Sequence, residues 1–298
     1  MTARSAFAVA VALVVGLARH AEAAPLTLGL FAPSAPFPSS AARVELAGRL
    51  ASALGKALHV SATARVYARA VDFAAAVKRG EVTLAVVDAA YLASVGGDPR
   101  VVAVALEDDE PTTAWQLVAR RGTKLIELAG KRVLVPGLGG READLVLEVL
   151  FGGDLGAGFA RLEPAPDTAS ALAALGLGKA DAVVVPARRG FPADAVVVRA
   201  LPALPNPVLV IYGALTTAER ADAIAAATAF TGDATFGGFR ADDGGAVRDV
   251  ARRFAAPGKR APFAVPAVRE AVEDLAPPRA FAIERTPAAV FALTGPAR

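Results

Sequence analysis

The chain has no cysteine and only two histidines, His20 and His59, among its 298 residues. Without cysteine it can form no disulfide bond and no thiolate metal site, and it offers neither a cysteine nucleophile nor a cysteine for a lipid anchor. The scarcity of histidine argues against histidine-rich metal sites and most histidine-based catalysis. We therefore expect no bound metal and no cofactor.

Charge of one sign and aromatic residues are also scarce. The formal net charge is +3, aromatic residues make up 6% of the chain, and Trp115 is the only tryptophan. Lysine and arginine are scattered along the sequence, which argues against a nucleic-acid-binding surface. Hydrophobic residues, in contrast, make up 54% of the chain. That is ample material for a packed core and excludes global disorder.

Residues 1–23 have the pattern of a secretory signal peptide. Arg4 supplies a positive charge, residues 6–17 form an apolar run too short to span a bilayer easily, and Ala21-Glu22-Ala23 is an A-x-A cleavage signal. The alternative is an uncleaved anchor helix, but no stop-transfer segment follows. We expect cleavage after Ala23 and export of a soluble protein to the periplasm.

Beyond the signal, short apolar runs alternate with helical periodicity, which predicts an α/β fold. Residues 26–31 predict a first strand, and residues 82–87 predict a strand buried on both faces. A helix is predicted over residues 141–151. Another is expected to begin at Ser39 or Ser40, with a buried face formed by Val44, Ala47, Ala51, Leu54 and Leu58.

Two segments repeat the same order of predicted elements. Residues 71–88 and 168–186 each contain a helix, a glycine (Gly80 or Gly178) and an apolar strand, and they align without a gap from the glycine to the end of the strand. Two similar α/β lobes would explain the repeat. The alternative is chance similarity between two segments rich in alanine and valine.

Several motifs occur in a familiar order along the chain. They are LTLGLFAP at residues 26–33, LASALG at 50–55, VKRG with LAVVDAAY at 77–80 and 84–91, LAGKRVLVP at 128–136, and ALAALGLGKADAVVV at 171–185. In this order they resemble the type 2 periplasmic solute-binding proteins, and most closely the branch that binds phosphate, phosphite or phosphonate for ABC importers. The resemblance covers about residues 25–255.

The resemblance implies two α/β lobes, each a mainly parallel sheet flanked by helices, joined by two hinge crossings near residues 108–113 and 203–212. Lobe 1 would comprise residues 24–110 and 206–298, with a C-terminal tail from about residue 255, and lobe 2 residues 111–205. A monomer would capture a small anion, phosphate- or phosphonate-like, by hinge closure. An ABC permease in the inner membrane would be its partner.

Two positions depart from the pattern of that family. The family has a loop rich in serine and threonine that holds an oxyanion, whereas residues 137–142 of this chain read GLGGRE and carry no hydroxyl group. Thr83 stands where the family has an acidic residue. These departures leave the ligand open. They also leave open an alternative function, an extracytoplasmic sensor or interaction module of the same fold that no longer serves transport.

In such lobes, ligands sit beyond the carboxyl ends of the strands, and this rule selects the candidate ligand-binding residues. They are Ser34, Tyr67, Asp88, Tyr91, Gly137, Gly139, Gly140, Arg141 and Arg188. The glycines would let backbone N–H groups approach an anion, and Arg141 would add a bidentate contact. The alternative is a tight turn with Arg141 in solvent.

The other candidates also have two interpretations each. Asp88 would accept hydrogen bonds from a ligand or would cap the helix that follows it. Tyr67 and Tyr91 would stack on a ligand or hydrogen-bond to it. Arg188 would add positive charge from the second lobe or would lie in a solvated loop.

No catalytic motif accompanies these residues. The sequence contains no G-x-S-x-G, no H-E-x-x-H and no P-loop. A binding protein needs none of them, so we expect a protein that binds a solute and is not an enzyme.

Overall fold

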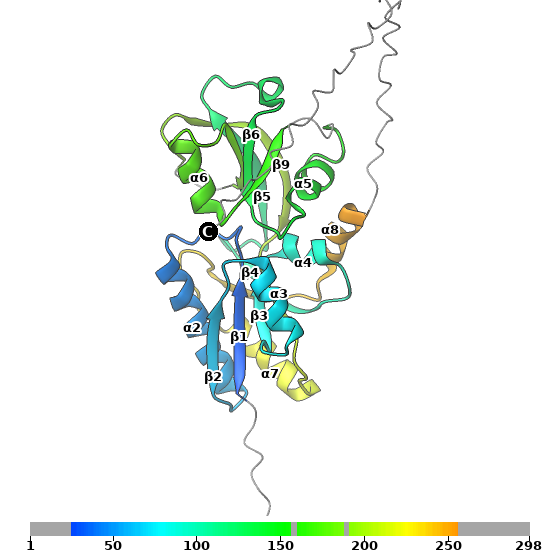
Figure 1. Ribbon diagram of the computed structural model, residues 1–298. Helices are drawn as coiled ribbons and strands as arrows, with labels where there is room; N and C mark the ends of the chain where they lie inside the picture. The colour runs from blue at the N-terminus through cyan, green and yellow to red at the C-terminus, as the bar shows by residue number, and fades with distance from the viewer. Residues whose placement is uncertain (1–24, 156–159, 188–190, 256–298) are drawn as a thin grey trace, which may run out of the picture. The chain divides into compact units, whose positions relative to one another are not determined.

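Two β-sheets with helices packed against them make up the described part of the protein (Figure 1). The computed structural model describes residues 25–155, 160–187 and 191–255. All of these belong to one compact unit of the chain. The expected signal peptide, Arg188 and the expected tail beyond residue 255 lie outside the described residues.

The first sheet, which with its helices we call lobe 1, has the strand order β11-β4-β10-β3-β1-β2. β1 pairs in parallel with β2 and β3, whereas β10 is antiparallel to β3 and β4, and β11 to β4. The strands are β1 (Leu26–Phe31), β2 (Ala62–Val66), β3 (Leu84–Val87), β4 (Arg100–Leu106), β10 (Val208–Ile211) and β11 (Gly238–Ala241).

The second sheet, which with its helices we call lobe 2, has the order β7-β6-β8-β5-β9. β6 is parallel to β7 and β8, and β5 is antiparallel to β8 and β9. The strands are β5 (Thr112–Arg120), β6 (Arg132–Pro136), β7 (Arg161–Ala165), β8 (Ala182–Pro186) and β9 (Ala195–Pro205).

The predicted two-lobed fold is confirmed, but both sheets are mixed and not mainly parallel. The reason lies in the two strands that enter a sheet from the other lobe. β10 follows β9 of lobe 2, and β5 follows β4 of lobe 1. Each strand enters its sheet from the side where the parallel strands have their carboxyl ends. It therefore runs antiparallel to them.

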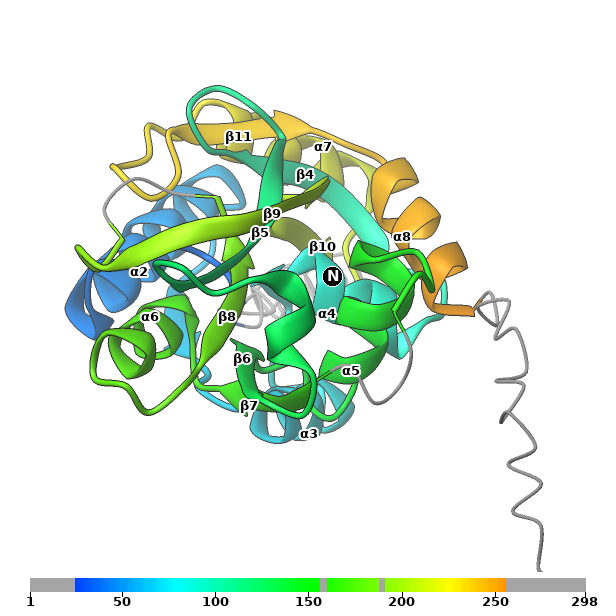
Figure 2. The same cartoon turned by 90° about the horizontal axis from the view of Figure 1, so that it is seen from above.

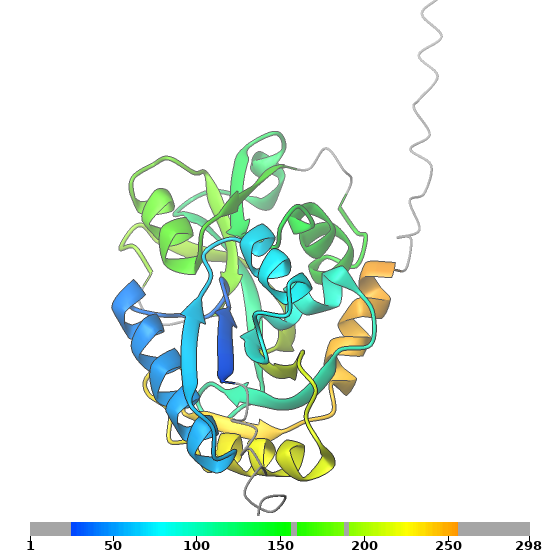
Figure 3. The same cartoon turned by 60° about the horizontal axis from the view of Figure 1, so that its bottom comes forward.

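The helices cover both sheets (Figures 1 and 3). In lobe 1, α2 and α7 pack against each other, and their apolar side chains belong to a different core cluster from Phe73 of α3. The helices are α2 (Ser40–Ala57), α3 (Ala70–Lys78), α4 (Ala89–Val95), α5 (Glu142–Asp144), α6 (Thr168–Gly176), α7 (Thr217–Thr228) and α8 (Gly245–Ala255), with a 3₁₀ turn at Leu125–Leu128.

The α2 helix begins as predicted, because the side chain of Ser39 accepts a hydrogen bond from the amide of Ala42. The predicted buried face is wrong at Val44, which is 58% exposed, and Leu58 lies just after the helix and is only partly buried. The buried stripe runs instead through Leu46, Ala47, Leu50, Ala51, Leu54 and Gly55. Sequence spacing alone had left out Leu46 and Leu50, the bulkier residues that face the sheet.

The predicted helix over residues 141–151 is only partly regular. It opens as α5 and continues as a π-helical segment over Leu145–Leu150. In that segment the apolar positions Leu145, Val146, Val149 and Leu150 are all buried. π-Helical turns inside α-helices are frequent at functional sites, and this one follows the glycine loop and the single turn of α5.

The repeated segments adopt the same conformation in both lobes. Gly80 after α3 has a φ of +69°, and Gly178 after α6 has a φ of +68°. The amide of Gly80 bonds to the carbonyl of Val77 at 3.0 Å, and that of Gly178 to the carbonyl of Leu175 at 3.0 Å. Glycine adopts this left-handed conformation just after the helix C-cap without strain, which explains why both segments carry it.

The chain passes between the lobes at residues 107–111 and again at Asn206 and Pro207. A tight turn at the first crossing has left-handed Asp108 and Asp109, with φ values of 51° and 65°. The Asn206 side chain ties the crossings together, because its Nδ2 donates to the carbonyls of Ala105 at 3.1 Å and Glu110 at 2.8 Å.

One apolar core cluster stays in lobe 1 and another in lobe 2, but a third extends through both. The third cluster contains Phe31, Phe73 and Tyr91 from lobe 1, and Leu138 and Leu145 from lobe 2. Helices α4 and α8 lie beside this contact and pack against each other (Figure 2). Among the described residues, no helix is long and apolar enough to cross a membrane.

Candidate ligand-binding cleft

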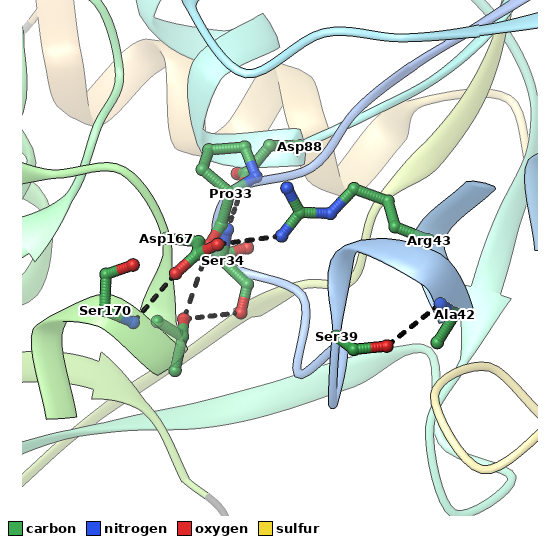
Figure 4. Close-up of polar contacts among 9 residues, drawn as sticks. Pro33, Ser34, Ser39, Ala42, Arg43, Asp88, Asp167 and Ser170 are labelled. Carbon is green, nitrogen blue, oxygen red and sulfur yellow. Dashed lines mark hydrogen bonds and ion pairs between the residues drawn. The ribbon is translucent and has the colours of Figure 1, made fainter. Parts of the chain in front are cut away.

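The loop after β1 meets the start of α6 directly across the cleft (Figure 4). The amide of Thr168 donates to the carbonyl of Pro33 at 3.0 Å, and its hydroxyl donates to the carbonyl of Ser34 at 2.9 Å. Thr168 is 1% exposed and Ser34 is 7% exposed. These buried bonds join the carboxyl edges of the two sheets, where ligands are expected in this class of fold.

An ion pair reinforces the same contact (Figure 4). Arg43 of α2 donates to the carboxylate of Asp167 at 3.0 Å, and Asp167 also caps α6 by accepting from the amide of Ser170 at 2.8 Å. Partial burial works to raise the pKa of Asp167, but the bonds from Ser170 and the charge of Arg43 outweigh it and lower that pKa. We call Ser34, Arg43, Asp167 and Thr168 the interlobe latch.

Asp88 lies behind the latch and holds the loop after β1 in place. Its carboxylate accepts from the amide of Ser34 at 3.0 Å and from the amide of Ala90 at 3.0 Å. The second bond caps α4, as the structural interpretation of Asp88 expected. Burial raises the pKa of Asp88, and the hydrogen bonds from Ser34, Ala90 and Tyr91 offset only part of that rise.

The tyrosines converge on one aromatic cluster around Phe73. The Tyr91 ring lies edge-on to Phe31, with centroids 4.9 Å apart, and Tyr67 and Tyr212 both contact Phe73. Tyr91 is 5% exposed, and burial raises its pKa. The hydroxyl of Tyr67 is buried and has no hydrogen-bond partner among the described residues. A packed cluster of this kind contributes to the core beyond its buried area.

The glycine loop of lobe 2, residues 137–141, curls tightly. Gly139 and Gly140 have φ values of +76° and +106°, and a Cβ at Gly139 would lie 2.8 Å from the Cβ of Ala70 in lobe 1. The amide of Gly137 donates to the carbonyl of Ala165 at 2.9 Å. The amides of Leu138 and Gly140 donate to Glu142, at 2.7 Å and 3.1 Å.

Arg141 is partly exposed, and its guanidinium is held by contacts with three other residues. Its guanidinium pairs with Asp144, donates to the carbonyl of Ser94 in α4 at 3.1 Å, and lies over the ring of Phe254, 5.3 Å from its centroid. It therefore bridges lobe 2 to α4 and α8. A cavity of about 590 Å³ opens beside it, with Arg248 and Arg252 also on its wall.

The space left between the cleft residues near the latch is small. Ser34, Trp115, Pro186 and Asn206 help to line a cavity of about 10 Å³, which is about the least that can hold one water molecule. Thr113 stands on the same wall, with its hydroxyl 2.6 Å from Oδ1 of Asn206 and 2.9 Å from Glu107. A solute can occupy this position only if the lobes move apart.

The structure thus brings Ser34 and Asp88 into contact, and places Tyr91 in the same apolar cluster as Leu138 of the glycine loop. Sequence reasoning did not select Arg43, Thr168 or Glu142. No local pattern reveals the first two, because their partners lie 124 and 134 residues away. Glu142 did have a signal: an acid just after a glycine-rich loop can fold back onto amides of that loop. Arg188 lies outside the described residues.

No family model matches the chain, and no curated protein matches it. Solved structures do. XAC2383 from Xanthomonas citri, bound to ATP, matches with a TM-score of 0.61 at 12% identity, over 78% of this chain and 97% of that one. The binding protein component of an ABC phosphonate transporter from Pseudomonas aeruginosa matches with a TM-score of 0.60 at 12% identity, over 78% of this chain and 85% of that one.

PhnD1 from Prochlorococcus marinus, in complex with methylphosphonate, matches with a TM-score of 0.60 at 10% identity, over 77% of this chain and 96% of that one. Likeness at this identity concerns the fold, and here the likeness spans from 85% to 97% of each neighbour. The order of the strands, the two crossings and these matches agree with the resemblance seen in the sequence. The chain has the two-lobed fold of the type 2 periplasmic solute-binding proteins.

Proposed function

We propose that this protein is an exported solute-binding protein that captures a small anion between its lobes for an ABC importer. The observation that carries the proposal is the interlobe latch, in which Thr168 of α6 bonds to the loop after β1 of the opposite lobe. Two lobes that are joined by two short crossings and held by polar contacts at the latch can separate and close.

A phosphate- or phosphonate-like anion is the proposed solute. Arg43 lies at the latch with its Nε buried and without a partner among the described residues, so it has a donor available for an oxyanion. The latch amide of Thr168, which donates to Pro33 of the opposite lobe, is a further donor that lobe separation would uncover. Two structural neighbours are a phosphonate-transporter component and a protein holding methylphosphonate.

We propose that the residues selected from the sequence contact the solute once the lobes have opened. Ser34 would act through its backbone, and Tyr67 through its unpartnered hydroxyl. Tyr91, Gly137, Gly139, Gly140, Arg141 and Arg188 would complete the walls. Asp88 would hold the loop of Ser34 in place from behind. Binding would then replace bonds of the latch with bonds to the solute, and no chemical step is required.

The proposal includes export and a partner in the membrane. Cleavage after Ala23 would release a monomer into the periplasm, and an inner-membrane ABC permease would receive the solute. The intact mass of the exported protein should correspond to a chain that begins at Ala24. Retention of residues 1–23 in a membrane fraction would contradict this part of the proposal.

A thermal-melt screen tests the proposed solute class. The exported protein, refolded from denaturant to remove any carried solute, is melted with phosphate, methylphosphonate, ATP, sulfate, carboxylates and amino acids. A solute at 100 times its dissociation constant stabilises a protein by about 2.7 kcal/mol. For a chain of this size the melting temperature should rise by about 5 to 10 °C. A shift with amino acids alone would retain solute binding and reject the anion.

One observation favours the second candidate function, an extracytoplasmic sensor or interaction module. An apolar cluster that includes Leu138, Tyr91 and Phe73 joins the lobes, and opening the lobes would expose some of it to water at a cost. A module whose lobes stay together fits this packing. The absence of any thermal shift across the whole screen would favour this second function over transport.

A further inference from the structure

Glu142 is a buried acid at the mouth of the glycine loop. The residue is 6% exposed, and it lies at the start of α5. Oε1 accepts from the amide of Leu138 at 2.7 Å and from that of Gly140 at 3.2 Å, and Oε2 accepts from Gly140 at 3.1 Å. Burying a carboxylate is costly unless its oxygens are hydrogen-bonded, and these amides supply the bonds.

The loop is shaped around that carboxylate. Positive φ values at Gly139 and Gly140 turn the backbone so that the amides of Leu138 and Gly140 reach the same pair of oxygens. Concave groups of backbone amides of this kind bind anions. In this loop the anion is part of the chain, and it comes from a position only two to four residues after the amides that it holds.

In the part of the chain that the structure describes, no cation pairs with this carboxylate. None of the ion pairs among the described residues includes Glu142, and its neighbour Arg141 is paired with Asp144. The loop amides therefore face a full negative charge. A second anion brought to the same amides would meet that charge at close range, which is strongly unfavourable in a water-poor site.

The occupied loop faces the other lobe. Leu138 is 1% exposed and belongs to the apolar cluster that includes Phe73 and Tyr91 of lobe 1, and Gly139 lies against Ala70. A solute held between the lobes would thus lie near these amides. If these amides can bind the solute, they contribute to which solutes the protein selects.

We propose that Glu142 is a specificity-determining residue, a built-in anion that keeps the glycine-loop amides from solute anions. The inference rests on the proposed function and sharpens it, because an anionic solute must either displace Glu142 or bind without this loop. Displacement lowers the apparent affinity by the fraction of molecules in which Glu142 has left. Glu142 therefore weakens the binding of free oxyanions such as phosphate.

The test compares inorganic phosphate and methylphosphonate binding to the wild type, Glu142→Gln, Glu142→Ala and a control, Glu148→Ala, by calorimetry. Glu148 is an acid of the same segment for which no hydrogen bond or ion pair is described. Glu142→Gln removes the charge and keeps one acceptor oxygen. We expect at least one of these anions to bind the Glu142 variants ten or more times more tightly than the wild type, with the control unchanged.

The outcomes separate this inference from the proposed function. If wild type and Glu142 variants bind phosphate or methylphosphonate equally, the inference is overturned and the anionic solute stands. If only the Glu142 variants bind an anion, the inference stands and the proposed anionic solute is wrong. If none of the proteins binds either anion, both are overturned.

A measurement on the wild type covers the case in which a variant fails to fold. In ¹H–¹⁵N spectra titrated with phosphate, we expect the amide signals of Leu138 and Gly140 to keep their positions at concentrations that shift other cleft amides. Saturable shifts of these two signals in step with the rest of the cleft would overturn the inference.

Discussion

The two lobes are built on one plan and differ in how they hold their first loop. The strand order β2-β1-β3-β10 of lobe 1 matches β7-β6-β8-β5 of lobe 2 in direction. The three parallel strands also follow one another in the same chain order, whereas the antiparallel strand follows them in lobe 1 and precedes them in lobe 2. In both lobes, a buried carboxylate accepts hydrogen bonds from backbone amides of the loop that follows the central parallel strand, β1 in lobe 1 and β6 in lobe 2. Asp88 does so in lobe 1 and Glu142 in lobe 2.

The difference lies in where the carboxylate comes from. Asp88 follows β3, 54 residues from the Ser34 amide that it accepts, and also caps α4. It therefore connects two strands of the sheet. Glu142 is the first residue of α5, directly after the loop, and its hydrogen bonds among the described residues go to amides of that loop. Lobe 1 therefore uses Asp88 to hold its structure, whereas in lobe 2 we propose that Glu142 controls access to the amides of the glycine loop.

The largest expected effect comes from Asp88→Ala. The change leaves the amides of Ser34 and Ala90 buried without an acceptor, and each such group costs about 1 to 3 kcal/mol. We expect the free energy of unfolding, measured with urea, to fall by about 3 kcal/mol. Asp72→Ala is the control, because its weak pair with Arg69 is exposed. A loss of unfolding free energy no larger than that of Asp72→Ala would contradict the structural role of Asp88.

The second prediction concerns the latch, which joins the lobes. Asp167→Asn keeps an acceptor for the amide of Ser170 but removes the charge that pairs with Arg43, and both side chains are largely buried. We expect a loss of about 1.5 kcal/mol at neutral pH, measured by urea unfolding, with hydrogen exchange of the amides near Ser34 speeding up.

The pH dependence of the latch checks the same pair. The pKa of Asp167 is lower in the folded protein, so its contribution is present above the ordinary pKa of an aspartate, near 3.8, and is lost as the pH falls through the lower folded value. The difference between wild type and Asp167→Asn should therefore persist at pH 5 and 7 and shrink below pH 3.8. A difference that does not change with pH would mean that the charge contributes nothing.

The smallest effects are expected at the matched glycines. Gly80→Ala and Gly178→Ala each force a side chain into left-handed backbone, which costs about 1 kcal/mol. A Cβ at 80 would meet nothing within 4 Å, whereas one at 178 would meet only the mobile end of Arg120. Urea unfolding should give losses equal to within about 0.5 kcal/mol. A much larger loss at one glycine would break the equivalence of the lobes.

Local chemistry made much of the fold predictable. Ser39, Asp167 and Thr216 cap their helices because a side-chain oxygen satisfies amides that lie within a few residues. The short strand β7, with exposed Arg161 and a proline, was not predicted, since it lacks an apolar run. The strand β11 was not predicted either. Its residues form a strand because they pair with β4, and this partner is distant in the sequence.

The site was less predictable than the fold. Loops at the carboxyl ends of strands were the right region, and Ser34 and Asp88 do meet there. The Arg43–Asp167 pair joins segments that are 124 residues apart, so no local sequence pattern predicts it. The sequence predicts a glycine loop whose amides are available to an anion, whereas in the structure the amides of Leu138 and Gly140 donate to Glu142. The charge of Glu142 and its position two residues after Gly140 already indicate that its carboxylate could bond to these amides.

The most direct test of the central claim, that the lobes open and close around a solute, is a distance measurement. Because the chain has no cysteine, spin labels can be attached at Glu45→Cys on α2 and Ala173→Cys on α6, both exposed. The account predicts two distance populations, with the longer one enriched by Asp167→Asn and the shorter one by any solute that raises the melting temperature. A single distance, unchanged by the substitution and by every solute, would contradict hinge closure.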